Sequence, residues 1–247
     1  MWRKSNEQFR LYSFYTIMKN LYIKLCLLAL SAFFVQSLHA YDFEVDGIYY
    51  NITSSADKTV EVTYKNTSSN SYSGNISIPS TVYYSSTTYT VISINNYAFK
   101  YCMGLTSVTI PSSVTSIGHE TFRGCTGLTS ISIPSSVTSI DAYAFYGCSG
   151  LTSISIPSSV TYIGSSAFSK CNNLMDVALN SEEIVSKSYT TYNSLAGIFG
   201  SQVKQYTLGN KITSIGDYAF SSCTGLTSIT IPSSVTSIGS SAFYNCI

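Results

Sequence analysis

From residue 105 onward, hydrophobic and polar positions recur with a period of 23 residues. One unit, residues 128–150, reads LTSISIPSSVTSIDAYAFYGCSG. The units that share this pattern are 105–127, 128–150, 151–173, 174–202, 203–225 and 226–247, the fourth lengthened by an insertion in 180–196. A fixed period of about 20–50 residues is typical of solenoids, in which each repeat packs on the next.

Within a unit, the spacing of the apolar residues predicts the local structure. The run 128–133 alternates Leu or Ile with Ser and Thr, which predicts a short strand with one buried face, ended by Pro134. Val137 and Ile140 predict a second, shorter strand on the opposite wall. The segment AYAFYGC at 142–148 predicts one helical or 3₁₀ turn, because it lacks β-branched residues. Stacked units therefore predict a parallel β-sheet.

One column of the repeat holds only small or turn-forming residues: Asn95, Gly118, Asp141, Gly164, Gly216 and Gly239. Glycine, asparagine and aspartate tolerate a positive φ better than other residues. We therefore expect a left-handed turn at each of these positions.

The two ends of the repeat array differ. Residues 41–104 form an N-terminal region with a first partial repeat, in which FEVDGIYYNI and TVEVTYK predict a β-hairpin that caps the stack. At the other end the sequence stops at Ile247 without a polar capping segment. We expect this uncapped end to self-associate.

Residues 1–40 have the order of a secretory leader. Lys19 and Lys24 precede an apolar run over 25–35, and Ala40 offers a small residue for cleavage. Met18 is the expected start, and an uncleaved anchor that begins at Met1 is the alternative. The apolar run is shorter than the ~20 residues of a membrane span. We therefore expect a secreted or bacterial cell-surface protein that is not an integral membrane protein after cleavage.

Charge is scarce, which narrows the possible partners. Only 10% of the residues are charged, against about 25% in an ordinary domain. Residues 41–247 contain eight basic and eleven acidic residues, so no basic patch is available to neutralise phosphates. Nucleic-acid binding is not expected.

Catalytic groups are equally scarce. His119 is the one histidine in 41–247, and its place after a turn glycine indicates an exposed turn residue. Glu182 and Glu183 are adjacent in the insertion and need not face one another, as a glycosidase would require. We therefore expect that the protein is not an enzyme and that it has no cofactor and no metal site.

Six cysteines follow the same period: Cys102, Cys125, Cys148, Cys171, Cys223 and Cys246. Equal columns of neighbouring repeats lie ~4.8 Å apart, whereas disulfide-bonded Cβ atoms lie at ~3.8 Å. The interpretation is a ladder of buried thiols. Disulfides, favoured in an oxidising compartment, are the alternative.

The outward positions of the main strands form the candidate binding face. Its residues are Ser130, Ser132, Ser153, Ser155, Asp176, Gln205, Thr207, Ser228 and Thr230, with Tyr162, Tyr189 and Tyr192 as aromatic anchors. Hydroxyl groups supply adaptable hydrogen bonds and tyrosines supply contact area. A solvated sheet face without a partner is the alternative.

The unit LTSISIPSSVTSIDAYAFYGCSG and its copies, with YDFEVDGIYYNIT at 41–53, resemble the BspA-type leucine-rich repeats of bacterial surface proteins. The resemblance implies an α/β leucine-rich-repeat solenoid, export to the cell surface and binding of extracellular or host-surface proteins. The chain departs from the pattern where Asn180 and Gly209 replace the proline, and where Gly200 stands at the expected cysteine.

Protein binding or adhesion without catalysis is therefore the expected function. A carbohydrate-binding, lectin-like solenoid is the alternative, because aromatic and hydroxyl groups also suit sugars. Ice binding is a third hypothesis, which the mixture of Ser, Thr, Asp, Ala and Gln on the face disfavours.

Overall fold

The computed structural model describes residues 18–19, 24, 40–66, 72–191 and 193–247. Two compact units divide the chain, Met1–His39 and Ala40–Ile247. The predicted leader therefore lies almost entirely outside the described residues. Among the residues that are described, no helix has the length and apolar character needed to cross a membrane.

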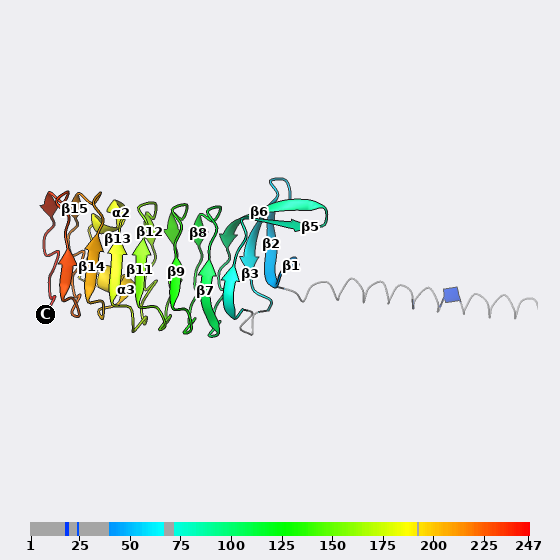
Figure 1. Ribbon diagram of the computed structural model, residues 1–247, viewed down its shortest axis with the longest axis horizontal. Coiled ribbons are helices and arrows are strands. Elements are labelled where there is room, and N and C mark those ends of the chain that lie inside the picture. The colour runs from blue at the N-terminus through cyan, green and yellow to red at the C-terminus, as the bar shows by residue number, and fades with distance from the viewer. Residues whose placement is uncertain (1–17, 20–23, 25–39, 67–71, 192) are drawn as a thin grey trace, which may run out of the picture. The chain divides into compact units, whose positions relative to one another are not determined.

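The main wall of the second unit is a row of parallel strands, as predicted (Figure 1). Its strands are β4 (Gly74–Ser77), β7 (Leu105–Thr109), β9 (Ser130–Ser132), β11 (Ser153–Ile156), β13 (Asp176–Leu179), β14 (Gln205–Leu208) and β16 (Ser228–Thr230). Equivalent columns pair, for example Val108 with Ile131 and Val177 with Tyr206. This register places the same side of every strand on the core.

The opposite wall is a second sheet of short strands, also as predicted. Its strands are β1 (Phe43–Val45), β2 (Ile48–Ser54), β3 (Thr59–Thr63), β6 (Thr87–Ile94), β8 (Ser116–Ile117), β10 (Ser139–Ile140) and β12 (Tyr162–Ile163), in that order across the sheet. Strand β5 (Thr81–Tyr84) pairs with β6, and β15 (Ser214–Ile215) pairs with β17 (Ser237–Ile238).

The predicted N-terminal hairpin is confirmed as the antiparallel pair β2–β3, to which β1 adds a third strand. Strand β3 then pairs parallel to β6, so the hairpin lengthens the second wall. An aromatic ring of the hairpin reaches the first phenylalanine of the core through Tyr72. Tyr49 contacts Tyr72, and the ring centroid of Tyr72 lies 4.5 Å from that of Phe99. The cap thus covers the core but adds no strand to the main wall.

A column of stacked phenylalanines fills the core. Phe122 and Phe145 have ring centroids 5.1 Å apart, and Phe145 and Phe168 are 4.8 Å apart. These rings are fully buried, and burial of one such side chain contributes about 1.5–3 kcal/mol. Each ring packs on the repeats at both sides, so a single repeat could not bury its phenylalanine by itself.

The prediction of left-handed turns at the glycine column is wrong. The positive φ values lie two residues later, for example 51° at Glu120 and 58° at Tyr143. Glycine is needed in the column for a different reason. A Cβ at Gly118 would lie 2.5 Å from Asn96 Oδ1, and one at Gly164 would overlap the main chain at Ala142.

The segment 142–148 forms successive turns and not a continuous helix. Tyr146 N–H donates to Tyr143 O at 3.0 Å, a bond of the predicted 3₁₀ type, but φ is 58° at Tyr143 and 73° at Gly147. Alternate amides bond to the next repeat instead, as Phe145 N–H does to Ala167 O at 2.7 Å. This third side, the turn wall, is therefore a hydrogen-bonded ladder between repeats.

The insertion in 180–196 folds into two short helices, α2 (Glu182–Val185) and α3 (Leu195–Phe199). Helix α2 replaces a second-wall strand, since Gly216 N–H donates to Val185 O at 2.9 Å. Phe199 continues the phenylalanine column, 5.1 Å from Phe168. This alignment places Gln202, and not Gly200, in the cysteine column.

The cysteine column is buried up to Cys223, and Cys246 is partly exposed. The six residues are thiols. Cys125, Cys148 and Cys171 each donate their S–H to the carbonyl of a phenylalanine one repeat earlier, at 2.9–3.1 Å. The thiols therefore act as small core side chains that also satisfy a main-chain acceptor.

Candidate functional site

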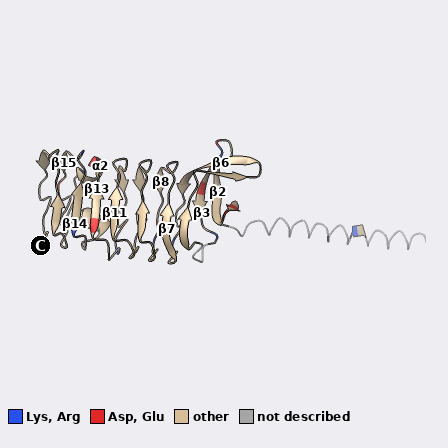
Figure 2. Ribbon diagram, viewed as in Figure 1, with Lys and Arg blue, Asp and Glu red and all other residues tan. Residues whose placement is uncertain are grey.

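The outward side of the main wall is the first candidate surface, here named the hydroxyl face. The nine strand residues predicted for it are all exposed: Ser130, Ser132, Ser153, Ser155, Asp176, Gln205, Thr207, Ser228 and Thr230. Pairing aligns them in two rows, so that Ser153, Asp176, Gln205 and Ser228 follow one another across adjacent strands. Figure 2 shows how little charge the strands of this wall carry.

The hydroxyl face continues toward the N-terminus through residues that sequence analysis missed. Asn75 and Ser77 of β4 are exposed and pair with Ser107 and Thr109 of β7. Asn75 Oδ1 accepts hydrogen bonds from Thr106 Oγ1 at 2.6 Å and Ser107 Oγ at 2.8 Å. The Ile-x-Ile-Pro pattern at 76–79 is the sequence signal that could have revealed this strand.

The tyrosines predicted as anchors do not belong to this face. Tyr162 is 50% exposed but lies in β12, on the second wall. Tyr189 is only 8% exposed, its hydroxyl donates to Ile184 O at 2.7 Å, and burial raises its pKa. Tyr192 lies outside the described residues. The prediction that these three tyrosines join the serines is therefore wrong for Tyr162 and Tyr189.

A compact aromatic and charged cluster lies on the turn wall. The ring of His119 stands edge-on between Tyr97 and Tyr143, with centroids 5.8 Å from each. His119 is therefore half-buried between two rings and less exposed than predicted. The 23-residue period places Tyr97 and Tyr143 in one column with Glu120 between them, and His119 lies one residue before that column, so the period alone did not reveal the three rings.

The carboxylate of Glu120 organises the charges of this cluster. It pairs with Lys100 Nζ at 2.6 Å and with Arg123 Nη1 at 2.7 Å. Burial by itself would raise the pKa of Glu120, but the hydrogen bonds from the two cations outweigh burial and lower it. The network thus links the turn that holds Lys100 to the turn of the next repeat, which holds Glu120 and Arg123.

A polar groove crosses the outer side of the second wall, with a volume of about 390 Å³. Its residues, here named the second-wall groove, include Glu61, Asn95, Asn96, Ser116, Ser139, Asp141 and Tyr162. Burial raises the pKa of Glu61. Tyr162 stands where Ser116 and Ser139 stand in earlier repeats, so its ring closes one end.

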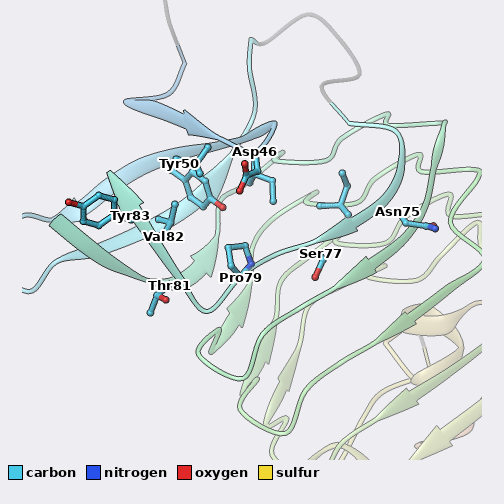
Figure 3. Close-up of a pocket in the computed structure, with 11 residues that line it drawn as sticks. Asp46, Tyr50, Asn75, Ser77, Pro79, Thr81, Val82 and Tyr83 are labelled. Atoms are coloured by element: carbon cyan, nitrogen blue, oxygen red, sulfur yellow. The ribbon is translucent and has the colours of Figure 1, made fainter. Parts of the chain in front are cut away.

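A second cavity, of about 410 Å³, lies between the N-terminal strands and the edge of β4 (Figure 3). Asn75, Ser77 and Pro79 line one side, and Thr81, Val82 and Tyr83 come from β5 on another. Asp46 and Tyr50 lie between these two groups. Burial, and secondarily the charge of Asp46, raises the pKa of Tyr50 to about 12. We name this cavity the strand slot.

Catalytic and metal-binding arrangements were sought among the same described residues. No group of three His, Cys, Asp or Glu side chains there could hold a metal ion. Glu182 does not converge with Glu183, because its carboxylate accepts from Thr213 N–H at 2.8 Å and from Thr213 Oγ1 at 2.7 Å.

Comparison with solved structures agrees with this architecture. A leucine-rich repeat protein from Bacteroides ovatus ATCC 8483 is 32% identical with a TM-score of 0.53, over 82% of this chain and 56% of that one. The leucine rich repeat protein of T. pallidum is 26% identical with a TM-score of 0.60, over 83% of this chain and 89% of that one. This chain thus spans little more than half of the Bacteroides ovatus protein.

No curated protein matches the chain. The model of the BspA type leucine rich repeat region matches in six copies, over residues 92–199 and 196–247. These residues carry strands β7 to β17, the phenylalanine column and the turn wall described above. Repeats of this kind form scaffolds for protein binding, and the chain belongs to the BspA-type leucine-rich-repeat family.

Proposed function

We propose that this protein is exported, is secreted or displayed on a bacterial cell surface, and binds an extracellular or host-surface protein without catalysis. The carrying observation is the hydroxyl face, whose exposed residues run in registered rows along the main wall. A flat surface of repeated hydroxyls provides many similar weak contacts, which add by multivalency. The leader-like order of residues 1–40 supports export.

The test is binding of the full chain to immobilised extracellular-matrix proteins. The variant Ser132→Lys with Ser155→Lys places two large charges on the hydroxyl face. Its control is Ser139→Lys with Ser237→Lys, the same change on the second wall. We expect saturable binding that the first variant weakens at least about tenfold and the second leaves unchanged. The reason is that the charge and bulk of the added lysines disrupt binding only on the face that contacts the partner. Equal effects of both variants would refute the assignment to this face.

A carbohydrate-binding function is the second candidate, favoured by the second-wall groove. Carboxylates and amides such as Glu61, Asn95 and Asp141 can hydrogen-bond sugar hydroxyls, and the exposed ring of Tyr162 can stack on a sugar face. A glycan array probed with the wild type and with Tyr162→Ser, the residue found at this column in earlier repeats, tests it. Hits that Tyr162→Ser abolishes support the lectin hypothesis, and an array without hits removes it.

A further inference from the structure

The two walls of the solenoid do not end at the same layer. Strands β4 and β6 form one layer, because β4 pairs with β7 and β6 pairs with β8. Beyond this layer the second wall continues with β3, β2 and β1. In the described part of the chain, the main wall stops at β4. The strand slot is the place beside β4 that the next main-wall strand would occupy.

The open side of β4 offers main-chain hydrogen-bonding groups to this slot. Gly74 N–H donates to Gly104 O at 2.8 Å and Ile78 N–H donates to Thr109 O at 3.1 Å, so the even-numbered residues bond to β7. Successive residues of a strand direct their main-chain groups to opposite sides. The N–H and C=O groups of Asn75 and Ser77 therefore face the slot. Such an edge is a template for an additional strand.

The walls of the slot match a single extended chain. Val45, Ile48, Ile76, Pro79 and Val82 supply apolar surface. The volume of about 410 Å³ lies within the ~300–1,000 Å³ typical of ligand sites. A complete repeat cannot dock there, because β3 already occupies the second-wall position of that layer. This excludes head-to-tail stacking of a second copy on β4.

Asp46 adds a charge preference. It is exposed in the turn between β1 and β2, lines the slot, and forms no ion pair with any other described residue. A cationic side chain on the incoming segment would complement it.

We propose that the strand slot binds an extended peptide segment of a partner protein by β-strand addition to β4. The segment alternates apolar residues, which face the core, with polar residues, and carries Lys or Arg beside Asp46. Main-chain bonds to Asn75 and Ser77 provide affinity, and the alternate side chains provide specificity. This site lies at the edge of the sheet and does not depend on the partner proposed for the hydroxyl face.

Ser77→Pro is the decisive variant. In the wild type the main-chain N–H of Ser77 makes no bond to β7. Proline is tolerated on the open side of an edge strand, so in the variant β4 remains in the sheet while the slot loses one hydrogen-bond donor. Ser77→Ala is the matched control, because it keeps the main-chain N–H. Asp46→Asn removes the charge, and asparagine accepts the positive φ of 52° at this turn.

The experiment pans a phage library of random octapeptides on the immobilised full chain, with counter-selection on Ser77→Pro. Enriched peptides are then synthesised with a fluorescent label and titrated by anisotropy. We expect alternating apolar and polar sequences that contain Lys or Arg. Ser77→Pro should weaken the binding of these peptides about tenfold or more. Ser77→Ala should weaken it less than about threefold, and Asp46→Asn about threefold to tenfold.

Peptides N-methylated at alternate amides provide a control that does not depend on the folding of any variant. Methylation of the amides that face β4 should abolish binding, and methylation of the intervening amides should leave it intact. Two outcomes would overturn the proposal. The first is that no peptide is enriched on the wild type relative to Ser77→Pro, and the second is that peptides bind equally well whichever set of amides is methylated. Asp46 lines the slot but is not part of the hydroxyl face. Retention of hydroxyl-face binding in Asp46→Asn, together with weakened peptide binding, therefore separates this result from the proposed adhesion function.

Discussion

Each glycine of the small-residue column is constrained by the main chain of the repeat before it. At Gly164 a Cβ would overlap the nitrogen of Ala142, and at Gly239 it would lie 2.5 Å from the nitrogen of Asp217. The constraint is one of space and not of φ. Sequence analysis singled out this column but predicted left-handed turns there, because sequence alone does not show which main chain lies opposite.

Gly164→Ala should therefore destabilise the protein by about 1–3 kcal/mol, the usual cost of overpacking. The measurement is the midpoint of urea unfolding. Gly104→Ala is the matched control, since its Cβ would lie 3.3 Å from Ser73 Cβ and meet no other side chain. It should be neutral or slightly stabilising. Equal midpoints for the two variants would contradict the packing argument.

The cysteine column predicts a graded reactivity toward thiol reagents. Burial raises the pKa of Cys148 well above its usual range and that of Cys223 to about 12, so little thiolate exists at pH 8. Cys246 is partly exposed. In a Cys26→Ser background, we expect iodoacetamide to label Cys246 first and the other five only upon unfolding. Rapid labelling of Cys148 in the native state would contradict the burial of the column.

At the scale of an element, helix α2 shows how an irregular segment supplies the hydrogen-bond acceptor that the next, regular repeat requires. In ordinary repeats a threonine carbonyl accepts from the next repeat, as Thr213 O does from Thr236 N–H at 2.8 Å. In α2 the carboxylate of Glu182 takes this role toward Thr213 N–H. The sequence indicated an insertion here but not this substitution, because a carboxylate can replace a carbonyl only when the fold brings it there.

Glu182→Gln should lower the free energy of unfolding at pH 7 by about 1 kcal/mol, because it weakens charge-assisted hydrogen bonds to Thr213. The adjacent Glu183→Gln is the control, since Glu183 is exposed and outside this network. We expect the control to change the free energy of unfolding by less than about 0.5 kcal/mol.

The same pair of variants tests the pH dependence. Burial alone would raise the pKa of Glu182, but hydrogen bonds from Thr213 and Ser214 lower it below the unfolded value of 4.5. A lowered folded pKa means that the stabilisation is complete above the unfolded pKa and is lost as pH falls through the folded one. The difference in Tm between wild type and Glu182→Gln should therefore be complete at pH 7 and shrink as the pH falls below 4.5. A difference that does not shrink as the pH falls would exclude the ionised carboxylate as its source.

At the scale of the whole Ala40–Ile247 unit, the two ends of the array are unequal. Tyr72 and the N-terminal strands cover the first phenylalanine. In the last repeat, Ile231 is 39% and Ile238 54% exposed, whereas Ile133 and Ile140 in the same columns are buried. The apolar surface of one layer is thus open to solvent at 226–247.

We predict that this surface drives concentration-dependent self-association. Sedimentation velocity of the full chain should show a rising average mass between micromolar and tens of micromolar protein, and Ile231→Lys with Ile238→Lys should reduce it. The matched control, Thr227→Lys with Ser240→Lys, adds the same charge at exposed polar positions of that repeat. Association that both variants reduce equally would indicate a general charge effect.

The amino-acid sequence by itself determined the period, the two strands of each regular repeat, the cysteine column, the N-terminal hairpin and the exposed serines and threonines of the regular repeats. It could do so because every repeat packs on a near-copy of itself. A pattern read within 23 residues therefore also describes the contacts between layers, so that local and long-range information coincide.

Only the tertiary structure decided several other features. It placed the positive φ values at residues such as Glu120, buried Tyr189 within the insertion, showed Tyr162 on the second wall and left the strand slot open beside β4. The burial of Tyr189 and the strand slot depend on how an irregular segment meets a regular layer. That meeting is set by space and hydrogen-bond partners supplied from residues distant in the chain, which no periodic pattern encodes.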